Sequence, residues 1–128
     1  MRILIDTHVL LWAALGDARL SPAAEAIIGD RSQELLFSTV SAMEIAMKHA
    51  AGRLALPDEV RNWIHTRVAA FGLVELPLST EHAIEAGLLP GHHRDPWDRL
   101  LVAQARIEGA TLLTADSAIH RYEVTTIW

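Results

Sequence analysis

The stretch that decides the fold is Arg2–Asp6, with the sequence RILID, in which a short apolar run ends at an acid. Apolar residues that follow one another without alternation indicate a strand covered on both faces, as in a parallel sheet. Thr111–Asp116, with the sequence TLLTAD, has a similar form. Because amphipathic helical segments separate such runs, the sequence predicts an α/β fold with a mostly parallel central sheet of about five strands.

The other elements follow from apolar runs and from residues that begin or end helices. Further strands are expected over 35–37, 73–76 and 124–127. Helices are expected where Ser, Thr, Asp or Pro precedes an amphipathic run, and several of these runs end at glycine: 9–14, 22–28, 41–52, 57–71, 80–86, 95–108 and 116–120. Ser41 and Glu44 have the spacing of a capping box, which places Glu44 in the first turn of its helix.

Length and composition narrow the class of protein. A chain of 128 residues fits a single domain over 1–128, and 51% hydrophobic with 21% charged residues excludes intrinsic disorder. The chain has no cysteine, which excludes disulfide scaffolds and thiolate metal sites and fits a cytoplasmic location. No apolar run approaches the roughly 20 residues that a bilayer requires, so no membrane association is expected.

Acidic residues recur where expected strands end or expected helices begin. In open parallel sheets, ligands bind beyond the carboxyl ends of the strands. Carboxylates gathered there repel one another unless a cation lies between them. Mg²⁺ and Mn²⁺ prefer such oxygen ligands, whereas a site made of acids alone does not match zinc. Each acid also has a local explanation as a helix cap. The acids are Asp6, Glu44, Asp95, Asp98 and Asp116.

The net charge of −5 is unusual for a protein that binds nucleic acid. Setting aside four site acids leaves twelve acidic against eleven basic residues, which is close to balance. Candidate contacts to phosphate are Lys48, Arg53, Arg94 and Arg99. The alternative for Lys48 and Arg99 is pairing with nearby acids. The four tryptophans lack an accompanying basic stripe, so we interpret them as core or interface residues.

Four segments taken together resemble PIN domains, and more specifically the VapC-type ribonuclease toxins of bacterial toxin–antitoxin pairs. They span almost the whole chain: Ile3–Trp12, Ser41–Leu54, His93–Ala105 and Thr111–Asp116. The resemblance implies a three-layer α/β/α sandwich. It also places Asp6, Glu44, Asp98 and Asp116 on the acids of the family's metal site, with Asp95 either a helix cap or an additional ligand.

The same resemblance implies an activity and partners. The activity is that of a Mg²⁺- or Mn²⁺-dependent endoribonuclease that acts on structured RNA, such as a tRNA or a ribosomal RNA loop. The expected partners are a cognate antitoxin, which inhibits the enzyme, and a second copy of the chain in a homodimer.

Two other functions remain open at this point. Phosphotransfer domains also carry an acid at a strand end, but they need a second Asp two residues later or a Lys at a late strand end. His8 occupies the first of these positions, and Lys48, the only lysine, is not at the second. A catalytically silent PIN-like protein-binding module is the other alternative, although the presence of all four acids gives no sign of a dead site.

Overall fold

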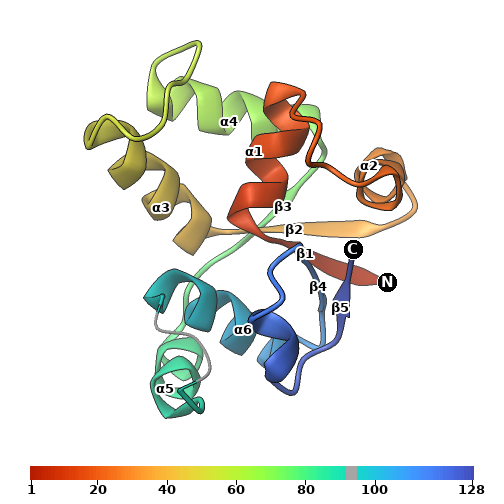
Figure 1. Ribbon diagram of the computed structural model, residues 1–128, viewed down its shortest axis with the longest axis vertical. Coiled ribbons are helices and arrows are strands. Elements are labelled where there is room, and N and C mark those ends of the chain that lie inside the picture. The colour runs from red at the N-terminus through yellow and green to blue at the C-terminus, as the bar shows by residue number, and fades with distance from the viewer. Residues whose placement is uncertain (92–94) are drawn as a thin grey trace.

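A five-stranded parallel sheet forms the centre of the computed structural model, which describes residues 1–91 and 95–128 (Figure 1). The strands are β1 (Arg2–Ile5), β2 (Glu34–Ser38), β3 (Val74–Leu76), β4 (Thr111–Leu113) and β5 (Thr126–Ile127). Their order in the sheet is β3-β2-β1-β4-β5, and every pairing is parallel. The predicted α/β class and the predicted number of strands are therefore confirmed.

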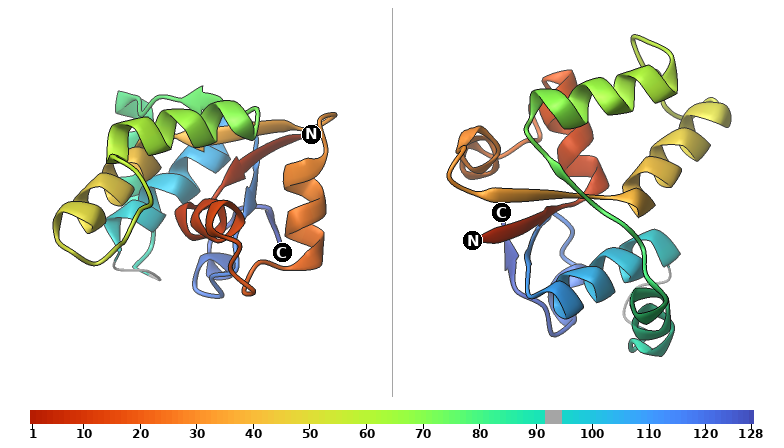
Figure 2. Two further views of the ribbon diagram at one scale, coloured as in Figure 1. Left: turned by 90° about the horizontal axis from the view of Figure 1, so that it is seen from above. Right: turned by 180° about the vertical axis from the view of Figure 1, so that it is seen from behind.

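Helices cover both faces of the sheet, which makes the three layers of an α/β/α sandwich (Figures 1 and 2). The first face carries α1 (Thr7–Leu15), α2 (Pro22–Gly29) and α4 (Val60–Ala70). The second carries α6 (Pro96–Glu108), α5 (Thr80–Leu88), which packs on α6, and the 3₁₀ turn η1 (Ile119–Arg121). Helix α3 (Thr39–Ala50) leaves the carboxyl end of β2 and contacts both α1 and α6.

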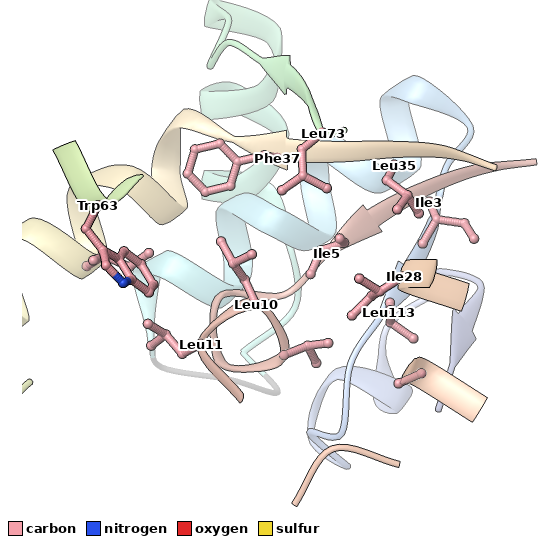
Figure 3. Packing of buried hydrophobic residues seen from close by; sticks show 13 residues of the cluster. Ile3, Ile5, Leu10, Leu11, Ile28, Leu35, Phe37, Trp63, Leu73 and Leu113 are labelled. Carbon is pink, nitrogen blue, oxygen red and sulfur yellow. The ribbon is translucent and has the colours of Figure 1, made fainter. Parts of the chain in front are cut away.

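Alternate residues of the central strands point into two separate cores. Ile3 and Ile5 of β1 pack with Phe37 of β2 in the core beneath α1, α2 and α4, which Figure 3 shows from close by. Leu4 lies between them in sequence and belongs to the opposite core, under α6. Since both faces bury apolar side chains, β1 needs a continuous apolar run, as the sequence has.

The start of α3 differs from the sequence-based prediction. Ser38, the last residue of β2, caps the helix, because its Oγ accepts a hydrogen bond from the backbone N–H of Val40 at 3.0 Å. Ser41 lies inside the helix and shares a 2.7 Å hydrogen bond with the hydroxyl of Thr7. The predicted capping box is therefore wrong, and Glu44 lies in the second turn with no capping role.

Within the described residues, none of the helices combines the length and the apolar character that crossing a bilayer would need.

Candidate active site

Asp6 is buried where β1 ends and α1 begins, with 3% of its surface exposed. Its Oδ2 accepts a 2.6 Å hydrogen bond from the hydroxyl of Thr114, and its Oδ1 accepts a longer one, 3.4 Å, from the backbone N–H of His8. Burial raises the pKa of the Asp6 carboxyl. The contacts with Thr114 and His8 oppose that rise, and the negative charge of Glu44 adds to it. Asp6 and Glu44 are thus close enough to interact electrostatically.

Glu44 projects from the second turn of α3 and is 1% exposed. Its Oε2 accepts a 2.7 Å hydrogen bond from the ammonium of Lys48, one turn further along the helix. Its Oε1 is buried and has no hydrogen-bond partner in the described part of the chain. A buried acceptor costs free energy unless a donor or a cation satisfies it, so this oxygen is a candidate ligand atom.

Asp116 is joined to Asp6 through Thr114, the buried residue that follows β4. The Thr114 hydroxyl donates to Asp6 and also accepts a 3.1 Å hydrogen bond from the backbone N–H of Asp116. Asp6 and Asp116 line one pocket of about 320 Å³ together with His8, Trp12, Arg19 and Ala115. The sequence analysis did not single out Thr114, although a polar residue directly after a buried strand could have signalled it.

Asp95 and Asp98 both lie at the start of α6 but differ in burial. Asp95 is the N-cap of the helix, since its Oδ1 accepts a 2.9 Å hydrogen bond from the backbone N–H of Trp97. Asp98 lies in the first turn and is 6% exposed. This end of α6 lies on the side of the sheet where β1 and β2 end and where α1 and α3 begin (Figures 1 and 2). The capping role expected for Asp95 is confirmed.

Two of the four cations predicted to contact phosphate are bonded within the protein. Lys48 pairs with Glu44, as its alternative interpretation expected. The guanidinium of Arg99 donates to carbonyl oxygens at the end of α5 and in the loop that follows. These oxygens belong to Ala86 at 2.9 Å, Leu89 at 2.8 Å and Pro90 at 3.0 Å. These hydrogen bonds give Arg99 a structural role, and its contact with phosphate stays a prediction.

Arg53 and Arg94 are the other two predicted cations. Arg53 is exposed, at the turn after α3. Arg94 lies outside the described residues, as does His93 of the third motif.

The four acids suit a hard divalent cation in kind, because every donor is a carboxylate oxygen and Glu44 Oε1 is buried with no partner among the described residues. Among residues 1–91 and 95–128, however, no three such side chains are close enough together to hold a metal ion as they lie. Lys48 occupies one oxygen of Glu44, and Thr114 occupies one oxygen of Asp6. Metal binding would need side-chain shifts that bring the carboxylates closer together.

Comparisons with known proteins agree with this fold. Residues 3–124 match the model of the PIN domain. Over 132 aligned residues, the chain is 31% identical to Ribonuclease VapC22 of Mycobacterium tuberculosis, with 98% of each chain covered.

Solved structures share the fold at lower identity. A DNA-bound VapBC from Salmonella typhimurium superposes with a TM-score of 0.74 at 16% identity, covering 99% of this chain and 97% of the other. VapBC2 from Rickettsia felis, bound to a promoter DNA fragment, gives a TM-score of 0.72 at 14% identity, covering 100% and 99%. With almost its whole length matched by the domain model and by a VapC relative, this chain belongs to the PIN-domain family, in its VapC branch.

Proposed function

We propose that this protein is a divalent-metal-dependent endoribonuclease toxin that hydrolyses RNA phosphodiester bonds and that a cognate antitoxin inhibits. The observation that carries the proposal is the buried carboxylate of Glu44, which is close enough to Asp6 to affect its pKa. One oxygen of Glu44 has no partner in the part of the chain that the structure describes. A structural acid would normally have both oxygens satisfied. The ribonuclease name of the VapC relative supports the choice of RNA as substrate.

Asp6, Glu44, Asp98 and Asp116 would hold Mg²⁺ or Mn²⁺. Such an ion, when bound, supplies a water of lowered pKa and offsets the charge of the reacting phosphate. Asp116 is less buried than the other three acids, and we assign it the role of accepting a proton from water at the solvent side of the pocket. Thr114 fixes Asp6 and the backbone of Asp116 relative to each other. Because water is the attacking group, we expect fragments with 5′-phosphate and 3′-hydroxyl ends.

The proposed partners follow from the same acids. An arginine from an antitoxin could donate its planar fork to these carboxylates and compete with the metal. Structured RNA, such as a tRNA or a ribosomal RNA loop, is the proposed substrate. We also propose that the protein forms a homodimer and acts in the cytoplasm. The silent binding module has no supporting observation comparable to the unpartnered oxygen of Glu44.

One assay tests the activity. Purified protein is incubated with total RNA in Mn²⁺ or in EDTA, alongside Asp6→Asn protein as the control. We expect fragments only with wild-type protein and metal, and end-labelling should identify their 5′-phosphates. Intact RNA in every lane would favour the silent module, and hydrolysis of a small phosphomonoester would favour a phosphatase.

A second assay tests the inhibitor. The product of the neighbouring gene is co-expressed, and cleavage by the complex is followed as Mn²⁺ rises. We expect inhibition that weakens when the arginine in the inhibitor's tail is changed to Ala. Equal inhibition by that variant would place the arginine away from the acids.

A further inference from the structure

Arg19 lies at the same pocket as Asp6 and Asp116, although no sequence motif singled it out. It belongs to the loop between α1 and α2, and its side chain is 69% exposed. Two carboxylates at a pocket repel the phosphates of an approaching RNA strand, so a cation at the same place has a clear electrostatic value. Of the cations expected from sequence, Lys48 pairs with Glu44, and Arg99 is bonded to main-chain carbonyls.

Asp17 holds the guanidinium of Arg19 in one orientation. Nε donates to Oδ1 of Asp17 at 3.1 Å, and Nη2 donates to Oδ2 at 2.7 Å. The backbone N–H of Arg19 also donates to Oδ1, at 2.9 Å. These hydrogen bonds from Arg19 lower the pKa of the Asp17 carboxyl to about 2, so the pair stays charged at neutral pH. Among the described residues, Nη1 has no hydrogen-bond partner, so the outer edge of the guanidinium is available.

The same guanidinium lies over the ring of Trp12. The Cζ atom of Arg19 lies 5.0 Å from the centroid of the Trp12 ring, which is cation–π distance. The ring is itself fixed by the edge of Trp128, at 5.8 Å between centroids, and it neighbours His8 at 6.2 Å. With Asp17 at one edge and Trp12 at one face, Arg19 is oriented before any ligand arrives, which reduces the ordering cost of binding.

We propose that Arg19, oriented by Asp17 and Trp12, contacts an RNA phosphate beside the one that is hydrolysed. The guanidinium fork matches the geometry of phosphate oxygens and stays charged at any physiological pH. This inference rests on the proposed ribonuclease function and adds a substrate-binding residue to it. It also gives Trp12 a role at the pocket, whereas the sequence analysis interpreted it as a core or interface residue.

The test measures binding of a fluorescein-labelled RNA stem-loop, in EDTA so that no cleavage occurs. We expect Arg19→Ala to weaken binding roughly tenfold, and to reduce the slope of log K against log salt by about 0.7 to 0.9, the loss of one phosphate contact. The matched control is Arg61→Ala, an equal change of charge at an exposed position of α4 that is not part of this pocket. Its binding constant and salt slope should stay close to wild type.

A second variant separates orientation from net charge. Asp17→Ala removes a negative charge near the pocket, so charge alone predicts tighter RNA binding. If Asp17 serves to orient Arg19, binding should instead weaken about threefold, an intermediate effect that reflects lost preorganisation. Melting temperatures of all three variants are measured to confirm folding.

The possible results distinguish this inference from the proposed function. If wild-type protein cleaves RNA in Mn²⁺ but Arg19→Ala binds RNA with the wild-type constant and slope, Arg19 is not a phosphate contact and the ribonuclease proposal stands. Equal losses in Arg19→Ala and Arg61→Ala would show a general charge effect and overturn the inference. Tighter binding by Asp17→Ala would overturn the orienting role. Wild-type protein that neither binds nor cleaves RNA would overturn both proposals.

Discussion

The buried imidazole of His82, at the face formed by α5 and α6, has a hydrogen-bond partner at each ring nitrogen. The buried carboxylate of Glu44, at the carboxyl edge of the sheet, has a partner at only one oxygen within the described residues. His82 Nδ1 accepts from the backbone N–H of Ser79 at 3.0 Å, and Nε2 lies 3.1 Å from Glu108. Nearby, Arg99 donates to several main-chain carbonyls. In the described structure, Glu44 Oε1 has no such partner.

The difference separates polar groups that are satisfied within the fold from the acids of the proposed metal site. At the α5–α6 face, internal hydrogen bonds offset the free energy of desolvating each named group. Removing one of these groups should therefore lower the free energy of unfolding. At the sheet edge, desolvation is repaid in part only, and burial raises the pKa of Asp6. Removing a charge there should cost activity and not stability. The predictions below test this contrast.

The largest effect is expected at the sheet edge. Asp6→Asn and Asp98→Asn each retain the side-chain shape but remove a charge that a divalent cation needs, so each should reduce RNA cleavage by at least about 100-fold. The measurement is the rate of fragment formation from total RNA in Mn²⁺. Cleavage by either folded variant near the wild-type rate would remove that residue from the proposed metal site.

The pH dependence of stability offers a second measurement at Asp6. Because its pKa in the folded chain is raised above the ordinary 3.8, the folded state binds the proton more tightly than the unfolded state. The resulting stabilisation is complete below pH 3.8 and is lost as the pH rises through the raised pKa. Asp6→Asn should escape this loss, so its free energy of unfolding in EDTA should exceed that of wild type above that pKa. Urea titrations across pH 4 to 8 would check the sign.

Metal should stabilise the same edge. At a concentration near 100 times its dissociation constant, Mn²⁺ bound only to the folded state should add about 2.7 kcal/mol to the free energy of unfolding. The measurement is the melting temperature with Mn²⁺ against EDTA. Asp98→Asn, as the matched control, should respond less. A melting temperature that millimolar Mn²⁺ leaves unchanged would argue against the proposed ligands.

At the α5–α6 face, Arg99→Ala should lower the free energy of unfolding by about 2 kcal/mol, because three carbonyl oxygens at and beyond the end of α5 lose their donor. Arg99→Lys should lose less, since an ammonium can still donate to one or two of them. Urea unfolding measures both. Unchanged stability in Arg99→Ala would argue against the structural role and favour the predicted contact with phosphate.

The smallest effect is expected at Asp95, which caps α6 through Trp97 N–H. Asp95→Ala should cost about 1 kcal/mol of stability, and Asp95→Ser, which keeps a capping oxygen, should cost little. Both variants should retain RNA cleavage if the cap is the whole role. Loss of cleavage in the folded Ser variant would instead make Asp95 a member of the site.

The sequence predicted features that depend on neighbours along the chain. The apolar run before Asp6 is enough to indicate a doubly covered strand, and Asp95-Pro96 is enough to begin a helix, since both signals are local. The start of α3 was misplaced because Ser38 and Ser41 are both suitable caps by type. Only the contact of Ser41 with Thr7, from another helix, shows that its hydroxyl is engaged elsewhere.

Features that depend on distant partners were not predictable from one sequence. The role of Arg99 depends on carbonyls of another helix, and the place of Arg19 depends on a pocket whose acids come from β1 and from the residues after β4. Thr114 was missed for the same reason, because its partner Asp6 is 108 positions away. The sequence pointed to the candidate acids, but not to the side chains that orient them.

The hydrogen bond between Thr114 and Asp6 also means that the candidate site can form only late in synthesis of the chain. The two halves of the candidate site are synthesised 108 residues apart, which is about 5 to 20 s of translation at typical bacterial and eukaryotic rates. The central strand β1 likewise has to wait for β4, its neighbour in the sheet, before it is flanked on both sides. A nascent chain that has not yet released β4 therefore lacks the Asp6–Thr114–Asp116 connection. A protein that cuts RNA would thus be harmless to the message and ribosome producing it until translation is nearly finished.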